Sequence, residues 1–209
     1  MEITEIIQLN KQRSQIFLDT GESFVLYKGE IRILKLKAGS AISEETYNSI
    51  IKGILPKRCK LRAMNLLKTK DYTAYQLKRK LLDSGYPDYI ADEAIDYVKQ
   101  YGYVNDNRYA LSYVSSKLQT TGRNEIKQKL IQKGLSKEVI DGAFLQFEEE
   151  DISGRQTWEM EAEVIRKTLV KKGYHEGLEY EDKQKLLAYF YRRGFDIELV
   201  RRVMDEHLT

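Results

Sequence analysis

The pattern that most constrains the fold of this chain occurs three times, once around each of Gly85, Gly134 and Gly194. An apolar residue stands eight residues and four residues before each glycine, and another follows it directly. These positions are Leu77, Leu81 and Tyr86 in the first copy, Ile126, Leu130 and Leu135 in the second, and Leu186, Phe190 and Phe195 in the third. Apolar residues spaced by four share one face of a helix, and a glycine directly after a helix adopts a positive φ without strain. The pattern therefore predicts three copies of a helix that ends at a glycine.

Each copy also carries signals for two further helices. Pro87, Ser136 and Asp196 follow the three glycines and are residue types that begin helices. The segments RAMNLLK, RYALSYVSSKL and AEVIRKTLVKK precede the three copies and have helical apolar spacing. We therefore expect a mainly α chain of three tandem three-helix repeats, in which the repeated apolar side chains form the core.

The amino-terminal part has a different pattern. The short runs SQIFLD, SFVLY and EIRILKLK are separated by the turn-like segments DTGES and KGE, which predicts a small antiparallel sheet with ITEIIQL as a further candidate strand. Ser43, followed by two acidic residues, predicts the start of a helix. The expected organisation is a β-rich segment with a short helix at 1–55, followed by repeats at 56–107, 108–149 and 150–209.

Positive charge is concentrated in the middle of the chain. Residues 57–147 carry 17 Lys and Arg against 10 Asp and Glu, whereas residues 1–56 balance at seven each and residues 148–209 carry 11 against 15. A basic region of this kind is typical of a surface that meets a polyanion.

Basic residues recur in the second helix of the first two repeats. Lys78, Arg79 and Lys80 align with Lys127, Gln128 and Lys129, whereas the third repeat has Leu187, Ala188 and Tyr189 at these positions. We expect these side chains to point outward and to bind the partner, while most of the 15 tyrosines fill helix interfaces. Tyr72, next to Lys70, is an exception that could stack on a base. The candidate partner-binding residues are Lys70, Tyr72, Lys78, Arg79, Lys80, Arg123, Lys127, Lys129 and Lys133.

The predicted third helices argue against a sequence-specific DNA reader. Helix-turn-helix proteins place their last helix in the major groove, but the segment DYIADEAIDYVKQY has four acidic residues and one lysine. DNA phosphates would repel such a helix. A nonspecific cationic groove and a protein-scaffolding module stay open as alternatives.

Signals for catalysis, metals, cofactors and membrane insertion are absent from the sequence. It contains no GxxxxGK, HExxH or GxSxG motif and no calcium loop. Cys59 is the single cysteine and has no neighbours at metal-ligand spacing. No apolar run approaches the roughly 18 residues of a membrane span, and the amino terminus lacks the pattern of a signal peptide. We expect a cytoplasmic protein that is not an enzyme and has no catalytic residues, cofactor or metal.

The middle of the chain resembles a known family. The segment AMNLLKTKDYTAYQLKRKLLDSGYPDYIADEAIDYVKQYGYVNDNRYA, followed by TGRNEIKQKLIQKGLSKEVIDGAF, is similar to the RecX regulators of the RecA recombinase. In the first repeat, the EL..KL positions of the family correspond to Gln76, Leu77, Lys80 and Leu81. In the second, its G-R-x-x-I-x-x-x-L-x-x-K-G pattern corresponds to Gly122, Arg123, Ile126, Leu130, Lys133 and Gly134. The resemblance covers residues 60–147 strongly and the third repeat more loosely, and the amino-terminal strands resemble a β segment of longer members from Gram-positive bacteria.

The resemblance implies a function without catalytic chemistry. Its tandem repeats would form an elongated, curved body that lies in the groove of a RecA filament on DNA and limits filament growth, ATP hydrolysis and strand exchange. The implied partners are the RecA nucleoprotein filament and, weakly or without sequence preference, DNA, and we expect a monomer. The alternative interpretation is a nonspecific DNA-binding helical-repeat protein that acts without RecA.

Overall fold

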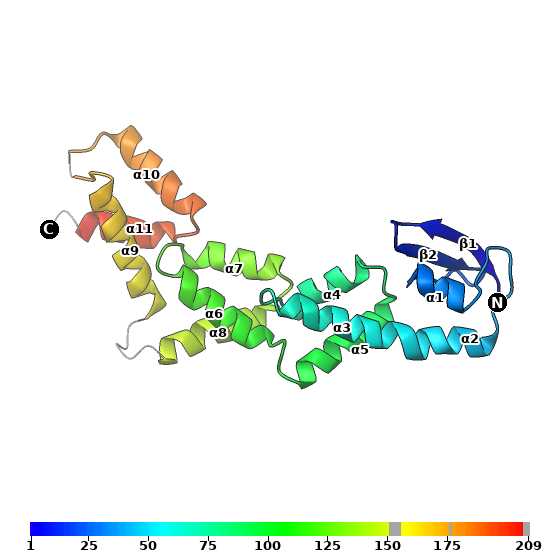
Figure 1. The fold of residues 1–209 in the computed structure, drawn as a ribbon. Coiled ribbons are helices and arrows are strands. Elements are labelled where there is room, and N and C mark those ends of the chain that lie inside the picture. Colours follow the sequence, from blue (N-terminus) through cyan, green and yellow to red (C-terminus); the bar gives the residue numbers. More distant parts are fainter. Residues whose placement is uncertain (151–155, 176, 207–209) are drawn as a thin grey trace. The chain divides into compact units, whose positions relative to one another are not determined.

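The computed structural model describes residues 1–150, 156–175 and 177–206, and the chain forms two compact units, Met1–Asn105 and Asp106–Thr209 (Figure 1). The first unit contains the sheet and one three-helix repeat. The second contains the other two repeats. The expected mainly helical fold with three three-helix repeats and a small amino-terminal antiparallel sheet is confirmed.

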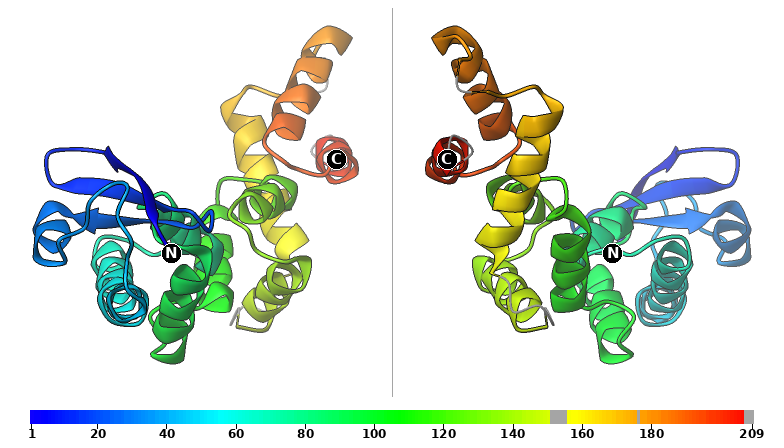
Figure 2. Two further views of the ribbon diagram at one scale, coloured as in Figure 1. Left: turned by 90° about the vertical axis from the view of Figure 1, so that its right-hand side faces the viewer. Right: turned by 90° about the vertical axis from the view of Figure 1, so that its left-hand side faces the viewer.

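The sheet has three antiparallel strands in the order β1-β2-β3, formed by β1 (Ile3–Gln8), β2 (Arg13–Leu18) and β3 (Ser23–Tyr27). Side chains of β2 alternate between buried and half-buried positions, with Ile16 fully buried. Because alternate residues of a strand face opposite sides, one face of the sheet packs inward. Figure 2 shows the strands as a layer beside the helices of this unit.

The run EIRILKLK forms no strand, and this part of the prediction is wrong. It contributes to helix α1 (Lys28–Ile33), whose first turn is closed by the Glu30 carboxylate accepting a hydrogen bond from the Tyr27 backbone N–H at 2.7 Å. Ile31 and Leu34, three residues apart, pack against the core, whereas Ile33 between them is 80% exposed. The helical spacing of the two packed residues therefore favours a helix over a strand in this run. The third strand of the sheet is formed instead by the candidate segment ITEIIQL.

A continuous helical stretch connects the sheet segment to the first repeat. It comprises α2 (Glu44–Asn48), a π-helical segment (Ser49–Ile54) and α3 (Leu55–Leu67). The predicted cap is confirmed, since Ser43 Oγ accepts from Thr46 N at 3.1 Å. Helix α3, with Pro56 in its first turn, therefore continues directly from the preceding helical segments. The π-helical segment ends at Ile54, two residues before Pro56, whose missing N–H interrupts the regular hydrogen-bond ladder.

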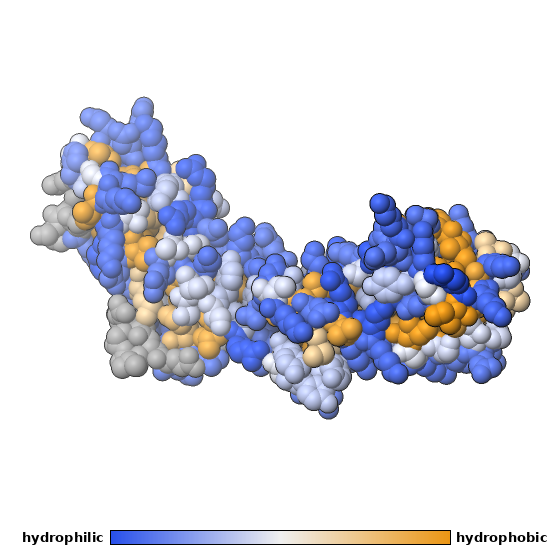
Figure 3. All heavy atoms as spheres, viewed as in Figure 1, coloured by the Kyte–Doolittle hydropathy of each residue, from blue (hydrophilic) through white to orange (hydrophobic). Residues whose placement is uncertain are grey.

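The first repeat consists of α3, α4 (Ala74–Leu82) and α5 (Asp88–Gln100). Its buried side chains belong to the same hydrophobic cluster as those of the sheet. This cluster includes Ile3, Ile16 and Phe24 from the strands together with Leu77, Leu81, Ile90 and Val98 from the helices. The sheet and the first repeat thus share one core. Figure 3 also shows hydrophobic side chains gathered on the surface near the sheet.

The second unit has two separate cores, one for each repeat. The second repeat consists of α6 (Asp106–Lys117), α7 (Arg123–Gln132) and α8 (Lys137–Glu150). The third consists of α9 (Thr157–Lys171), α10 (Tyr180–Arg192) and α11 (Ile197–Glu206).

The three repeated glycines end their helices as predicted. Gly85, Gly134 and Gly194 have φ values of 86°, 82° and 75°. In each copy the backbone N–H of the following apolar residue donates to the carbonyl five residues earlier, which closes the last helical turn. These bonds join Tyr86 to Leu81 at 3.4 Å, Leu135 to Leu130 at 3.2 Å and Phe195 to Phe190 at 3.1 Å.

Candidate partner-binding surface

Lys78 on α4 is paired with the third helix of its own repeat. Its Nζ lies 2.7 Å from Asp92 Oδ1 and 3.1 Å from Asp88 Oδ1, both on α5, and its side chain is 30% exposed. Hydrogen bonds to the carboxylates of Asp92 and Asp88 raise the pKa of Lys78. The side chain therefore helps to hold α4 against α5.

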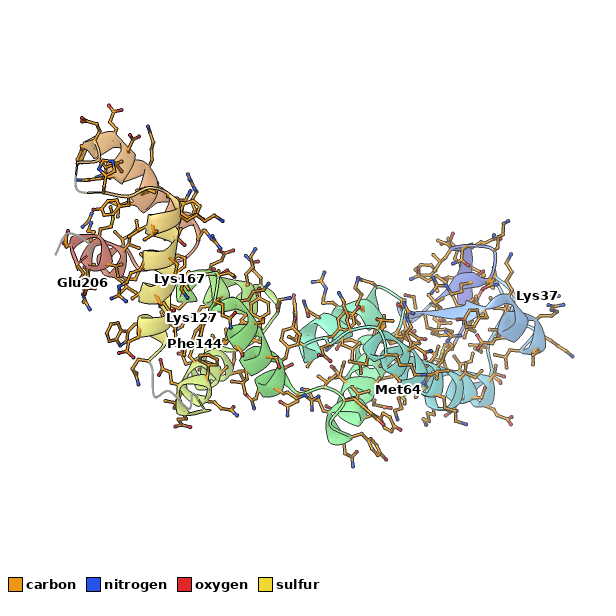
Figure 4. All side chains as sticks on the ribbon, turned by 60° about the vertical axis from the view of Figure 1, so that its left-hand side comes forward. Lys37, Met64, Lys127, Phe144, Lys167 and Glu206 are labelled. Carbon is orange, nitrogen blue, oxygen red and sulfur yellow. The ribbon has the colours of Figure 1, made fainter. Side chains whose placement is uncertain are left out.

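Lys127 makes the equivalent pair in the second repeat. Its Nζ lies 2.6 Å from Asp141 Oδ1 on α8, and this hydrogen bond lowers the pKa of Asp141. The same ammonium lies 5.5 Å from the centroid of the Phe144 ring, and Figure 4 shows the two side chains beside each other. The aligned positions of the third repeat hold Leu187 and Arg201, so both partners of the pair are replaced together.

Arg123 does not face outward as expected, because it lies at the junction between the second and third repeats. Its backbone N–H donates to Glu161 Oε1 at 2.7 Å, its Nη2 donates to Thr157 Oγ1 at 2.9 Å, and its guanidinium lies 5.3 Å from the Phe144 ring centroid. Two of these partners, Thr157 and Glu161, belong to α9. Arg123 is therefore a residue that positions the third repeat.

Two glycines permit this close junction. A Cβ on Gly122 would lie 2.3 Å from the backbone of Gly194, and a Cβ on Gly194 would lie 2.2 Å from Glu125 N. Backbone hydrogen bonds join the two segments, from Gly122 N to Arg193 O at 2.9 Å and from Asn124 N to Gly194 O at 3.1 Å. The amino end of α7 therefore contacts the turn after α10 backbone to backbone.

Two other predicted cations lie over tyrosine rings. Lys70 Nζ is 4.7 Å from the Tyr72 ring centroid, so the predicted neighbours contact each other. Lys133 Nζ is 5.5 Å and 5.4 Å from the ring centroids of Tyr109 and Tyr113, which stack at 6.4 Å. Each ammonium is thus within the distance at which a cation is attracted to the face of an aromatic ring.

Arg79, Lys80 and Lys129 are exposed to solvent. Arg79 Nη1 is 3.5 Å from the Tyr75 hydroxyl on the same helix. No carboxylate lies within ion-pair distance of these three cations in the part of the chain that the structure describes. Lys70 is likewise exposed and has no acidic partner among the described residues, so these four of the nine candidates combine exposure with the absence of such a partner there.

The partners of Lys78, Lys127 and Arg123 were missed in the sequence interpretation. A signal for two of them exists, because an aspartate follows fourteen residues after each lysine, at positions 92 and 141. No such signal identifies Glu161, which is 1% exposed and lies 38 residues from Arg123. Its burial raises its pKa, while the Arg123 N–H and guanidinium oppose this effect.

Within residues 1–150, 156–175 and 177–206, no three His, Cys, Asp or Glu side chains converge as metal ligands. None of the helices described is both long and apolar enough to cross a membrane. Cys59 is buried, and burial raises its thiol pKa to about 12.

Comparisons with known proteins identify the repeats. The first, second and third three-helix domains of RecX match residues 59–97, 105–143 and 159–204. The chain is 31% identical to the Regulatory protein RecX of Caldanaerobacter subterraneus subsp. tengcongensis, over 98% of this chain and 99% of the relative. It is 30% identical to the Regulatory protein RecX of Clostridioides difficile, over 99% and 96%.

Solved structures agree with the fold. A crystal structure of regulatory protein RecX superposes with a TM-score of 0.64 at 24% identity and covers 98% of both chains. The crystal structure of RecX from Lactobacillus salivarius gives a TM-score of 0.62 at 21% identity, over 73% of this chain and 96% of that one. From the domain matches and the full-length relatives together, this chain belongs to the RecX family.

Proposed function

We propose that this protein is a non-enzymatic, cytoplasmic regulator that binds the groove of RecA–DNA filaments as a monomer and inhibits filament growth, ATP hydrolysis and strand exchange. The observation that carries the proposal is the full-length similarity to relatives named Regulatory protein RecX, which extends over all three helical domains. The exposed cations of α4 and α7 support it, because a groove that contains DNA and acidic protein attracts positive charge.

Within this proposal, the direct contacts are assigned to Arg79, Lys80 and Lys129. Lys70, which lies over the Tyr72 ring, and Lys133, which lies over the Tyr109 and Tyr113 rings, are further candidate contacts. Lys78 and Lys127 form ion pairs with α5 and α8, and Arg123 is hydrogen-bonded to α9. We assign these three to positioning the helices that carry the contact residues.

The test is RecA ATPase activity on single-stranded DNA, titrated with this protein. The triple variant Arg79→Glu, Lys80→Glu, Lys129→Glu should need at least about tenfold more protein for half-inhibition, since charge reversal converts attraction into repulsion. A matched control reverses Lys52, Lys99 and Lys171, which also lie in the last turns of their helices. Unchanged inhibition by the folded test variant, or an equal loss in the control, contradicts the assignment.

The same assay separates this proposal from a DNA binder that acts without RecA. A protein that inhibits only by occupying DNA loses its effect when single-stranded DNA is in large excess over it. A regulator of the filament keeps its effect at a fixed ratio to RecA. Relief of inhibition by excess DNA would therefore replace the proposed function with the DNA-binding alternative.

A further inference from the structure

A cleft of about 540 Å³ opens in the first unit between the sheet and the first repeat. Its cations are Lys11 and Arg13 from the hairpin that joins β1 to β2, and Arg62 from α3. Tyr27 at the end of β3 and Tyr86 after α4 also line it. None of these residues belongs to the surface of α4 and α7 to which RecA contact is assigned.

The hairpin holds its two cations on a fixed backbone. Asn10 Oδ1 accepts hydrogen bonds from the backbone N–H groups of Gln12 and Arg13, both at 2.9 Å. Leu9 N donates to Arg13 O at 3.0 Å, and Lys28 N donates to Gln12 O at 2.9 Å. Arg13 pairs with Tyr27 in the sheet register. The turn thus places Lys11 and Arg13 at the cleft without requiring a partner to order it.

Glu30, which is hydrogen-bonded to the cleft residue Tyr27, is paired with an arginine outside the cleft. Glu30 accepts from Tyr27 N, and its Oε2 lies 2.6 Å from Arg58 Nη1. The Arg58 guanidinium lies 4.7 Å from the Tyr27 ring centroid and 5.6 Å from that of Tyr86, and it also donates to the Val25 carbonyl. Arg58 is therefore used in the fold, whereas Arg62, one helical turn later, is exposed.

All the charged side chains that line the cleft are positive. Its lining contains three cations and no carboxylate, and none of the three cations forms an ion pair with the residues that the structure describes. Elsewhere in this unit, Arg58 and Lys78 each have an acidic partner within about 3 Å. Cations that converge without a counterion repel one another, and a bound polyanion relieves this repulsion.

The shape and the aromatic content indicate which polyanion fits. The cleft is open to solvent rather than an enclosed cavity, and Tyr27 in its wall is 41% exposed. A cationic groove that tracks a backbone, combined with an exposed aromatic ring that can stack on a base, is the arrangement of single-strand binding proteins. We propose that this cleft binds single-stranded nucleic acid, with Lys11, Arg13 and Arg62 on successive phosphates and the exposed part of Tyr27 against a base.

The experiment measures the affinity of the full chain for a fluorescein-labelled oligothymidylate by anisotropy, without RecA and at several salt concentrations. The variant Lys11→Gln, Arg13→Gln, Arg62→Gln should bind at least tenfold more weakly at low salt. Its slope of log affinity against log salt should be shallower by about 2, since each phosphate contact on a single strand contributes about 0.7. Thermal unfolding confirms that the variant is folded.

The matched control is Lys37→Gln, Lys52→Gln, Lys99→Gln, which removes three exposed charges from the same unit outside the cleft. It should keep the affinity within about twofold and the salt slope unchanged. An equal loss in this control would show that net charge alone drives binding, and would overturn the proposal. No measurable binding by the unmodified chain at low salt, or undiminished binding by the cleft variant, would overturn it as well.

Competition identifies the source of the phosphates. Inorganic phosphate should displace the labelled strand no better than chloride at equal ionic strength, and an unlabelled duplex should compete more weakly than an unlabelled single strand. Specific displacement by inorganic phosphate would instead make the cleft a free-anion site, and stronger competition by the duplex would make it a duplex site. Either result overturns the single-strand assignment. Because RecA is absent from this assay, the outcome does not depend on the proposed regulatory function.

Discussion

Gly85 and Gly102 both have a positive φ, but they differ in the space around the missing Cβ. At Gly85, with φ 86°, an added Cβ would lie 2.2 Å from Val25 Cγ2 on β3. At Gly102, with φ 70°, no atom would lie within 4 Å. The turn after α4 therefore needs a glycine for two reasons, its backbone conformation and its contact with the sheet.

This difference predicts unequal costs for two alanine substitutions. Gly102→Ala should lower the free energy of unfolding by about 1 kcal/mol, the typical penalty for a left-handed non-glycine residue. Gly85→Ala should lower it by roughly 2 kcal/mol or more, because the clash with Val25 adds to that penalty. Urea unfolding of both variants checks the prediction. Equal losses would show that the sheet yields freely to the new methyl group.

At the scale of elements, the junction between α7 and α9 contains a buried carboxyl group with several charged neighbours. Glu161 contacts the Arg123 backbone, while Thr157 beside it donates to Glu148 on α8 at 3.0 Å through its backbone N–H. Burial raises the pKa of Glu161, with a smaller contribution from Asp196, and the hydrogen bonds from Thr157 lower the pKa of Glu148. As pH rises, the raised pKa of Glu161 therefore lowers the free energy of unfolding, whereas the lowered pKa of Glu148 increases it.

The direction in which Glu161 changes stability with pH follows from its raised pKa. Between its ordinary and its raised pKa, the folded chain binds more protons than the unfolded chain, so the free energy of unfolding falls as pH rises through this window. The contribution of Glu148 is present above its ordinary pKa and is lost as pH falls through its lowered pKa. Glu161→Gln should therefore remove the decrease in the free energy of unfolding that occurs as pH rises above the ordinary carboxyl pKa. The loss of stability that comes from protonating Glu148 at low pH should stay.

Melting temperature against pH measures this effect, with Glu163→Gln, two residues away on the same helix and more exposed, as the control. Carboxyl NMR titration gives the pKa of Glu161 directly. In an Arg123→Gln variant this pKa should rise further, because the guanidinium opposes the effect of burial. A Glu161 pKa at or below the usual carboxyl range would contradict the buried position of this side chain.

At the scale of the whole molecule, the three repeats differ in whether they have a hydrophobic core of their own. The first repeat shares its core with the sheet, whereas the second and third repeats each have a separate core within their unit. Helical regions that share one core exchange their amide protons together, and those with separate cores can open separately.

Ile16→Ala should therefore weaken the first repeat as well as the sheet. Ile16 is fully buried in the shared core, and removing it should lower the free energy of unfolding of the first unit by about 2 to 5 kcal/mol. Native-state hydrogen exchange should show faster exchange in α4 and α5 together with β2, and unchanged exchange in the second unit. Faster exchange confined to the strands would mean that the sheet opens independently of the helices.

The local structure of the helices could be predicted from the sequence because it depends on neighbours a few residues apart. The apolar spacing around Leu77 and Leu81, the glycine after the helix and the cap at Ser43 all act through hydrogen bonds and contacts between residues three to five positions apart. For the same reason the three-helix repeats were recognisable. The run EIRILKLK was not, since its apolar residues fit both a strand and a helix, and packing against the core selected the helix.

The composition of the candidate surface depended on tertiary structure. The sequence identifies the basic residues of α4 and α7, but not which of them the fold neutralises. Lys78 and Lys127 meet aspartates on a neighbouring helix, whereas Arg123 is hydrogen-bonded through its backbone N–H to a glutamate 38 residues away and through its guanidinium to Thr157. Arg79, Lys80 and Lys129 lie on the same helices and stay exposed. The physical reason is that helical periodicity sets the direction of a side chain, whereas the packing of other elements decides whether an opposite charge lies within a few ångströms of it.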